Sequence, residues 1–77
     1  MELTGRHPGT AHFGPLFEYA HLPEGALRDT SAECAKLAES MMELLPDGPE
    51  LSAGLRKLLE AKDCFVRTAL LALKNKE

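Results

Sequence analysis

The sequence has little of what β-sheets require. It contains no Trp and no Ile, a single Val and a single Tyr, and only 5% of its 77 residues are aromatic. Strands favour β-branched and aromatic side chains. Leu and Ala favour helices, and they supply 14 and 10 residues respectively. The composition therefore predicts an all-α fold, and the length suffices for one small domain.

Long apolar runs and a disulfide framework are also missing. The longest apolar run, Ala69 to Leu73, has five residues, whereas a membrane span needs about 20. The N-terminus lacks the basic segment and apolar run of a signal peptide. We therefore expect a cytoplasmic protein with no membrane partner. The two cysteines, Cys34 and Cys64, form no Cys-x-x-Cys pair, and we expect both to be reduced thiols packed on helices.

Neither a metal site nor a catalytic site is indicated by the residue pattern. His7, His12 and His21 are spaced five and nine residues apart, which matches no zinc-ligand pattern. No serine lies in a Gly-x-Ser-x-Gly elbow, and no glycine-rich loop precedes a Lys-Ser/Thr pair. We therefore expect a protein that is not an enzyme and that carries no metal or cofactor.

Charge is unevenly distributed along the chain. The net charge is −3, but residues 1–50 carry 3 Lys/Arg against 9 Asp/Glu, and residues 51–77 carry 6 against 3. An acidic chain is a poor candidate for nonspecific binding to duplex DNA, so no DNA partner is expected. Two interpretations of the basic segment stay open: it attracts the acidic segment across a hairpin, or it holds a small anion.

Glycine and proline divide the chain. Residues 1–15 hold three Gly and two Pro and predict an irregular N-terminal arm that can be removed without unfolding the rest. Residues 16–77 form the expected helical-hairpin domain, with helices over about 23–45 and 49–73.

The turn between these helices carries strong stop and start signals. Pro46 disfavours helical geometry at Leu45. Asp47 and Glu50 form a capping-box-like pattern for the second helix, with Pro49 in its first turn. Because the turn is short, we expect the two helices to be antiparallel.

Apolar residues mark one face of each expected helix. In the first helix the seam is Leu27, Thr30, Cys34, Leu37, Met41 and Leu44, and Ala38 and Leu45 widen it. In the second, the main stripe is Leu51, Leu55, Leu58, Phe65, Ala69 and Leu73, and an adjacent stripe is Leu59, Val66 and Leu70. Two helices alone cannot enclose a core, and chains this small usually need disulfides, a metal or association. We therefore expect a homo-oligomer that covers the surplus stripe.

Aromatic and cationic residues form a candidate ligand site. Phe17, Tyr19, His21 and Pro23 alternate along the chain, so an extended segment would place them on one side, where rings can stack a nucleobase. On spacing alone, the favoured interpretation is that the two aromatic rings plug the open end of the hairpin. The candidate cations are Arg56, Lys57, Lys62 and Arg67. Lys62 lies between Leu58 and Phe65 of the main stripe on the second helix. Its ammonium group either snorkels to solvent in a monomer or meets a phosphate in an oligomer.

Two segments resemble a known family. The segment from Tyr19 to Pro23 and the stretch 37–63, continuing to about residue 73, resemble phage-encoded helical-hairpin proteins that sequester cyclic nucleotide signals. These are the anti-CBASS and anti-Thoeris sponges. The family's Tyr-His-Pro-Pro segment, Pro-Asp/Asn-Ser-Arg-Glu turn and Leu-Glu-x-Ala helix correspond to residues 19–23, 46–50 and 59–61. The sequence is also similar to uncharacterised actinobacterial phage proteins with Phe-x-Tyr-x-His-Leu-Pro and Leu-Pro-Asp-Gly-Pro-Glu-Leu segments.

The resemblance implies a function and an assembly. It implies a hexamer built from dimers that binds cyclic di- or trinucleotides or cyclic ADP-ribose isomers in the bacterial cytoplasm. The messenger would stay uncleaved, and the CBASS or Thoeris effector would stay silent. Tyr19 would stack on a base, His21 would hydrogen-bond near it, and the cations would meet phosphates. The alternative is a helical protein–protein interaction module of a phage with no nucleotide ligand.

Overall fold

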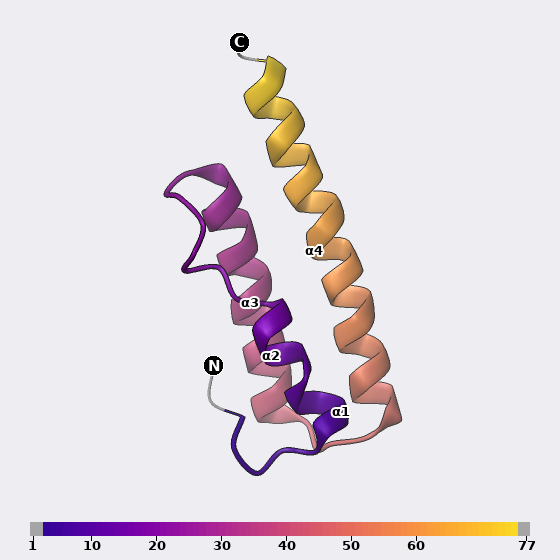
Figure 1. The fold of residues 1–77 in the computed structure, drawn as a ribbon. Helices are drawn as coiled ribbons and strands as arrows, with labels where there is room; N and C mark the ends of the chain where they lie inside the picture. The colour runs from indigo at the N-terminus through magenta and orange to yellow at the C-terminus, as the bar shows by residue number, and fades with distance from the viewer. Residues whose placement is uncertain (1–2, 76–77) are drawn as a thin grey trace.

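The computed structural model describes residues 3–75 and is all-helical, as the composition predicts; these residues contain no strand. The two long helices run antiparallel, side by side, and the short ones lie across one face of this pair (Figure 1). The rod-shaped molecule measures 45 × 20 × 17 Å. In chain order the helices are α1 (Pro8–Ala11), α2 (Phe13–Leu16), α3 (Ala26–Leu44) and α4 (Pro49–Asn75).

The start and end of α3 follow from glycine and proline. The helix begins at Ala26, three residues later than expected, because Gly25 has a φ of 130° that residues other than glycine rarely adopt. At the other end, Leu45 is extended, with φ −117° and ψ 143°, as expected for a residue before proline. Pro23 therefore lies in the preceding loop rather than in the helix.

The α4 helix is longer than expected and is capped differently. It begins at Pro49, as predicted, and continues to Asn75, two residues beyond the expected end. The Gly48 carbonyl accepts its first backbone hydrogen bond, from the Ser52 N–H at 3.1 Å. The carboxylate of Asp47, expected to cap this helix, instead accepts hydrogen bonds from the N-terminal segment. With 27 residues against 19, α4 extends past the start of α3 (Figure 1).

The expected irregular arm is the largest departure from the sequence analysis. Residues 8–16 form α1 and α2, which both pack against α4. Pro8 occupies the first position of α1, where its missing N–H costs nothing, and His7 caps that helix by accepting a hydrogen bond from the Gly9 N–H. Phe13 and Phe17 are each 1% exposed. The arm is thus part of the core over these residues; residues 1 and 2, also assigned to it, lie outside the part of the chain described.

The core lies between the long helices and this N-terminal segment. Phe13 and Phe17 pack with ring centroids 6.5 Å apart and tilted by 44°, an arrangement that aromatic pairs favour. The remaining core residues are Ala35, Ala38, Met42, Leu51 and Leu55. The N-terminal segment therefore supplies the third layer that two helices lack, and oligomerisation is not needed to form a core.

The face that α3 buries is rotated by one position from the expected seam. Cys34 is buried as expected, but Leu37 is 48% exposed and Leu44 is 73% exposed. Buried instead are Ser31, Ala35 and Met42, together with Ala38 from the edge of the expected seam. The reason is that the large side chains for this face come from the N-terminal phenylalanines, so small residues on α3 fit opposite them.

Candidate functional site

The expected aromatic strip does not form an extended row. Phe17 is the C-cap of α2 and is buried, and its ring packs in the core with residues of α3 and α4. The chain then turns, with the Leu22 N–H bonded to the Tyr19 carbonyl at 3.0 Å. Tyr19 is half-buried against the core. His21 and Pro23 are exposed in the loop before α3.

Tyr19 borders a small hollow beside α3. The hollow holds about 160 Å³, and its lining includes Glu18, Ala35 and Glu39. A phosphate placed there would face two carboxylates without a cation among the lining residues. This hollow therefore suits a base or another uncharged group better than a phosphate.

Two of the four candidate cations hold the N-terminal segment in place. The Arg56 guanidinium lies 5.1 Å from the centre of the Phe13 ring. Lys62 Nζ donates to the Leu16 carbonyl at 2.8 Å and lies 5.8 Å from the centre of the Phe17 ring. Such cation–π contacts contribute about 0.5–1 kcal/mol at exposed sites. Lys62 thus contacts a carbonyl and an aromatic ring of its own chain. The sequence suggests solvent or a phosphate instead.

The other two candidate cations are exposed on α4. Lys57 is exposed. Arg67 is also exposed and approaches the sulfur of Cys64 at 4.0 Å. Contrary to expectation, Cys64 is not packed. Cys34 is buried, and burial raises the pKa of its thiol, so the thiol is mostly protonated at neutral pH.

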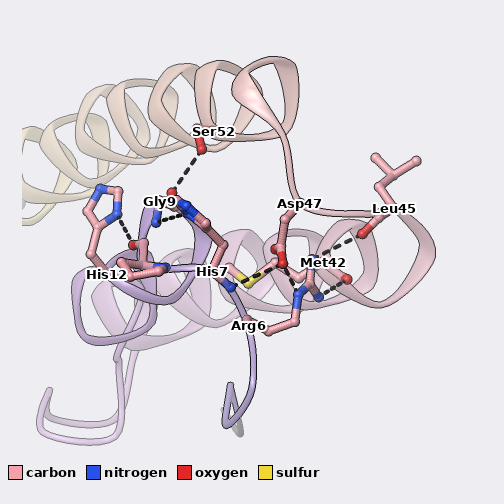
Figure 2. A network of polar contacts seen from close by, with 9 residues as sticks. Arg6, His7, Gly9, His12, Met42, Leu45, Asp47 and Ser52 are labelled. Carbon is pink, nitrogen blue, oxygen red and sulfur yellow. Dashed lines mark hydrogen bonds and ion pairs between the residues drawn. The ribbon is translucent and has the colours of Figure 1, made fainter.

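A polar network that the sequence did not reveal joins the N-terminal segment to the α3–α4 turn (Figure 2). The Arg6 guanidinium donates to the carbonyl of Met42, to the carbonyl of Leu45 at 3.1 Å and to Oδ1 of Asp47 at 2.9 Å. The His7 N–H donates to Oδ2 of Asp47 at 3.1 Å. Because these partners are about 40 residues apart, no local pattern indicates the network, which we call the Arg6 clamp.

The geometry explains why an arginine is needed. In a helix the Met42 carbonyl would accept from the N–H four residues later, but that residue is Pro46, which has no N–H. A guanidinium is a planar fork of five donors, so it can serve this carbonyl, the Leu45 carbonyl and a carboxylate together. In the first turn of α4, Ser52 Oγ donates a hydrogen bond to the Gly9 carbonyl at 2.9 Å. This hydrogen bond joins α1 to α4 (Figure 2).

The Arg6 clamp predicts a loss of stability in acid. The His7 N–H, together with Arg6, lowers the pKa of Asp47 below its ordinary value. A carboxyl with a lowered folded-state pKa stabilises the fold above its unfolded pKa, about 3.9, and this contribution is lost as the pH falls through the folded value. We therefore expect the wild type to melt at a higher temperature than Asp47→Asn at pH 7. This difference should shrink as the pH falls below about 4. An equal difference at both pH values would contradict this prediction.

An apolar groove lies at the turn end of the molecule. It holds about 590 Å³ between α3 and α4. Leu37 and Met41, two residues of the expected α3 seam that do not reach the core, line it together with Leu58 of α4. Its remaining lining is Leu45, Pro46, Asp47, Gly48, Pro49, Glu50, Leu51, Gly54 and Leu55. Part of the seam that the sequence assigns to the core thus lines an open apolar groove.

The two apolar stripes predicted on α4 have different surroundings. The stripe expected to be surplus is partly covered, since Leu59 packs against the core and Val66 is half-buried. In the main stripe, Leu51 and Leu55 are buried, but Phe65 is 55% exposed. The uncovered apolar surface of α4 therefore includes Leu70 of the stripe expected to be surplus, together with Phe65 and Leu73 of the main stripe.

Other classes of site are not evident in residues 3–75. No group of three or more His, Cys, Asp or Glu side chains there could hold a metal ion. None of the helices there has the length and apolar character that crossing a bilayer requires. Comparison with protein-family models, with curated proteins and with solved structures finds no match for this chain.

Proposed function

We propose that this protein binds a cyclic oligonucleotide messenger and sequesters it without cleavage, as a homo-oligomer in the cytoplasm of a phage-infected bacterium. The proposal rests on the resemblance to the anti-CBASS and anti-Thoeris sponges. The structural observation that carries it is the position of the Tyr19–Pro23 loop. His21 and Pro23 are exposed and Tyr19 is half-buried, so the segment that bears the resemblance is accessible to a ligand.

The surroundings of the candidate residues suit Tyr19 to base stacking and the exposed cations to phosphate contacts. Tyr19 is packed on one side, which holds the ring in place for stacking, and the hollow beside it lacks cations. The exposed cations Lys57 and Arg67 are the remaining candidates for phosphates, since Arg56 and Lys62 contact the N-terminal segment. In an oligomer, the cations of one copy can approach the loop of another.

The ligand contact is tested with Tyr19→Ala and Tyr19→Phe. A ligand that binds only the folded state raises the melting temperature, so a panel of cyclic dinucleotides, cyclic trinucleotides and cyclic ADP-ribose isomers identifies the messenger. Stacking contributes about 1–3 kcal/mol per base. We therefore expect Tyr19→Ala to lose about tenfold or more in affinity, and Tyr19→Phe to keep most of it. Leu71→Ala, an exposed change on α4, is the control; no loss in either tyrosine variant would remove Tyr19 from the site.

Sequestration differs from catalysis in the fate of the messenger. After incubation and heat denaturation of the protein, chromatography should recover the bound messenger intact. A linearised or cleaved product would show an enzyme instead.

The second candidate function is a helical protein–protein interaction module, which the apolar groove favours. Leu37 is half exposed at a position where its side chain contributes to the lining rather than to the core. A protein of this class would show no thermal shift with the nucleotide panel. It would bind a host or phage protein, and Leu37→Asp would abolish that binding while the fold stayed intact.

A further inference from the structure

One face of α4 is apolar from the groove to near the end of the helix. Its members recur every three or four residues and therefore lie on one side of the helix. They are Gly54, Leu58, Ala61, Phe65, Ala69 and Ala72, and we call them the α4 seam. Each is exposed or half-buried. We propose that the α4 seam packs against the same face of a second copy, with the two α4 helices antiparallel.

The α4 seam continues the groove. Gly54 and Leu58 belong to both, so a side chain that projects from a neighbouring helix can enter the groove where the seam begins. Phe65, seven residues beyond Leu58, is the largest side chain of the seam and is 55% exposed. Each molecule thus carries both a projecting ring and a recess on the same face, as a two-fold interface requires.

The sizes of the side chains define one register. If Phe65 lies opposite Gly54 of the partner subunit in an antiparallel pair, then Ala61, four residues back, lies opposite Leu58 of the partner subunit. Each large side chain then meets a small one, in both halves of the interface. Such alternation of large and small residues lets facing layers interdigitate without voids.

Charge favours the antiparallel orientation over the parallel one. The turn end carries Glu43, Asp47 and Glu50 against Arg6, while the far part of α4 beyond Asp63 carries Arg67 and Lys74. An antiparallel pair places the far part of each α4, with Arg67 and Lys74, beside the acidic turn end of the other copy. A parallel pair would bring like charges together, which is unfavourable.

A second copy is therefore the occupant that the surface fits best. This inference rests on the proposed homo-oligomer and specifies its contact surface, orientation and register. It does not depend on the ligand, because the seam and the Tyr19 loop are on different elements.

The test measures self-association by sedimentation equilibrium for the wild type and three variants. Phe65→Ala removes the projecting ring, and we expect its dimer dissociation constant to rise at least about tenfold. Gly54→Phe fills the recess and should have a similar effect. A Cβ at Gly54 would meet no packed neighbour within 4 Å, and phenylalanine has a better helix propensity than glycine, so we expect the monomer to stay folded. Leu71→Ala is the matched control, since Leu71 is 60% exposed but lies off the seam.

The decisive variant is the exchange of the two sizes. Gly54→Phe combined with Phe65→Ala restores a ring opposite a small residue in both halves of the interface. We expect the double variant to associate more tightly than either single variant, whereas independent effects would make it weaker than both. A wild type that stays monomeric would overturn the seam and the proposed homo-oligomer together. A wild-type oligomer that is insensitive to Phe65→Ala would overturn the seam alone.

Discussion

Replacing Phe13 with alanine is expected to destabilise the fold by about 3–5 kcal/mol. The Phe13 ring is 1% exposed, packs against Phe17 and lies under the Arg56 guanidinium. Its removal leaves a cavity in the core and removes a cation–π contact. A domain of this size has a total stability of at most several kcal/mol, so much of the variant should be unfolded at 25 °C. Urea denaturation followed by circular dichroism measures the loss.

The control for this prediction is again Leu71→Ala, which removes an exposed apolar side chain from α4. We expect a change within about 0.5 kcal/mol for it. Deletion of residues 1–14, which includes Phe13, should destabilise the protein at least as much as Phe13→Ala. If the deletion variant keeps its helical signal and its melting temperature, the N-terminal segment is not part of the core.

The fold class and the placement of the long helices could be predicted from composition and from prolines. Pro46 and Pro49 define the turn because proline acts locally, through its own ring and its missing N–H. The buried residues Leu51 and Leu55 were also predicted correctly, because they lie on an apolar face that α3 covers in the expected way.

The buried face of α3 could not be predicted because it depends on a third layer. Periodicity places Leu37 on the seam and Ala38 only at its edge, yet Ala38 is fully buried and Leu37 is 48% exposed. A small residue is preferred where another element approaches closely, and the glycines and prolines of that element predict an irregular arm rather than a packed layer. The spacing of four between Phe13 and Phe17 was the available signal, since it places both rings on the same side of a helical segment.

The candidate site was predicted by residue type, and residue type does not specify partners. Of the cations on α4, Arg56 and Lys62 contact the N-terminal segment, a use that depends on the position of α1 and α2. The Arg6 clamp depends on contacts between residues far apart in sequence. Such contacts are determined by the tertiary fold and leave no periodic pattern.

Replacing Arg6 with alanine is expected to cost about 1–3 kcal/mol, more than an exposed ion pair contributes. The larger effect follows from the Met42 carbonyl, which is partly buried and which Arg6 serves in place of the N–H that Pro46 lacks. Lys36→Ala is the matched control, because Lys36 forms an exposed ion pair with Glu33 within one helix. We expect at most about 0.5 kcal/mol for it.

A double-mutant cycle with Pro46→Ala separates the service to the Met42 carbonyl from the ion pair with Asp47. Alanine at position 46 supplies an N–H that can reach the Met42 carbonyl if the helix continues by one residue. The cost of Arg6→Ala should then be smaller in the Pro46→Ala background than in the wild type, and the difference is the coupling free energy. The corresponding cycle with Asp47→Asn measures the ion pair. Additive effects of the substitutions at positions 6 and 46 would show that Arg6 acts through Asp47 and not through the end of α3.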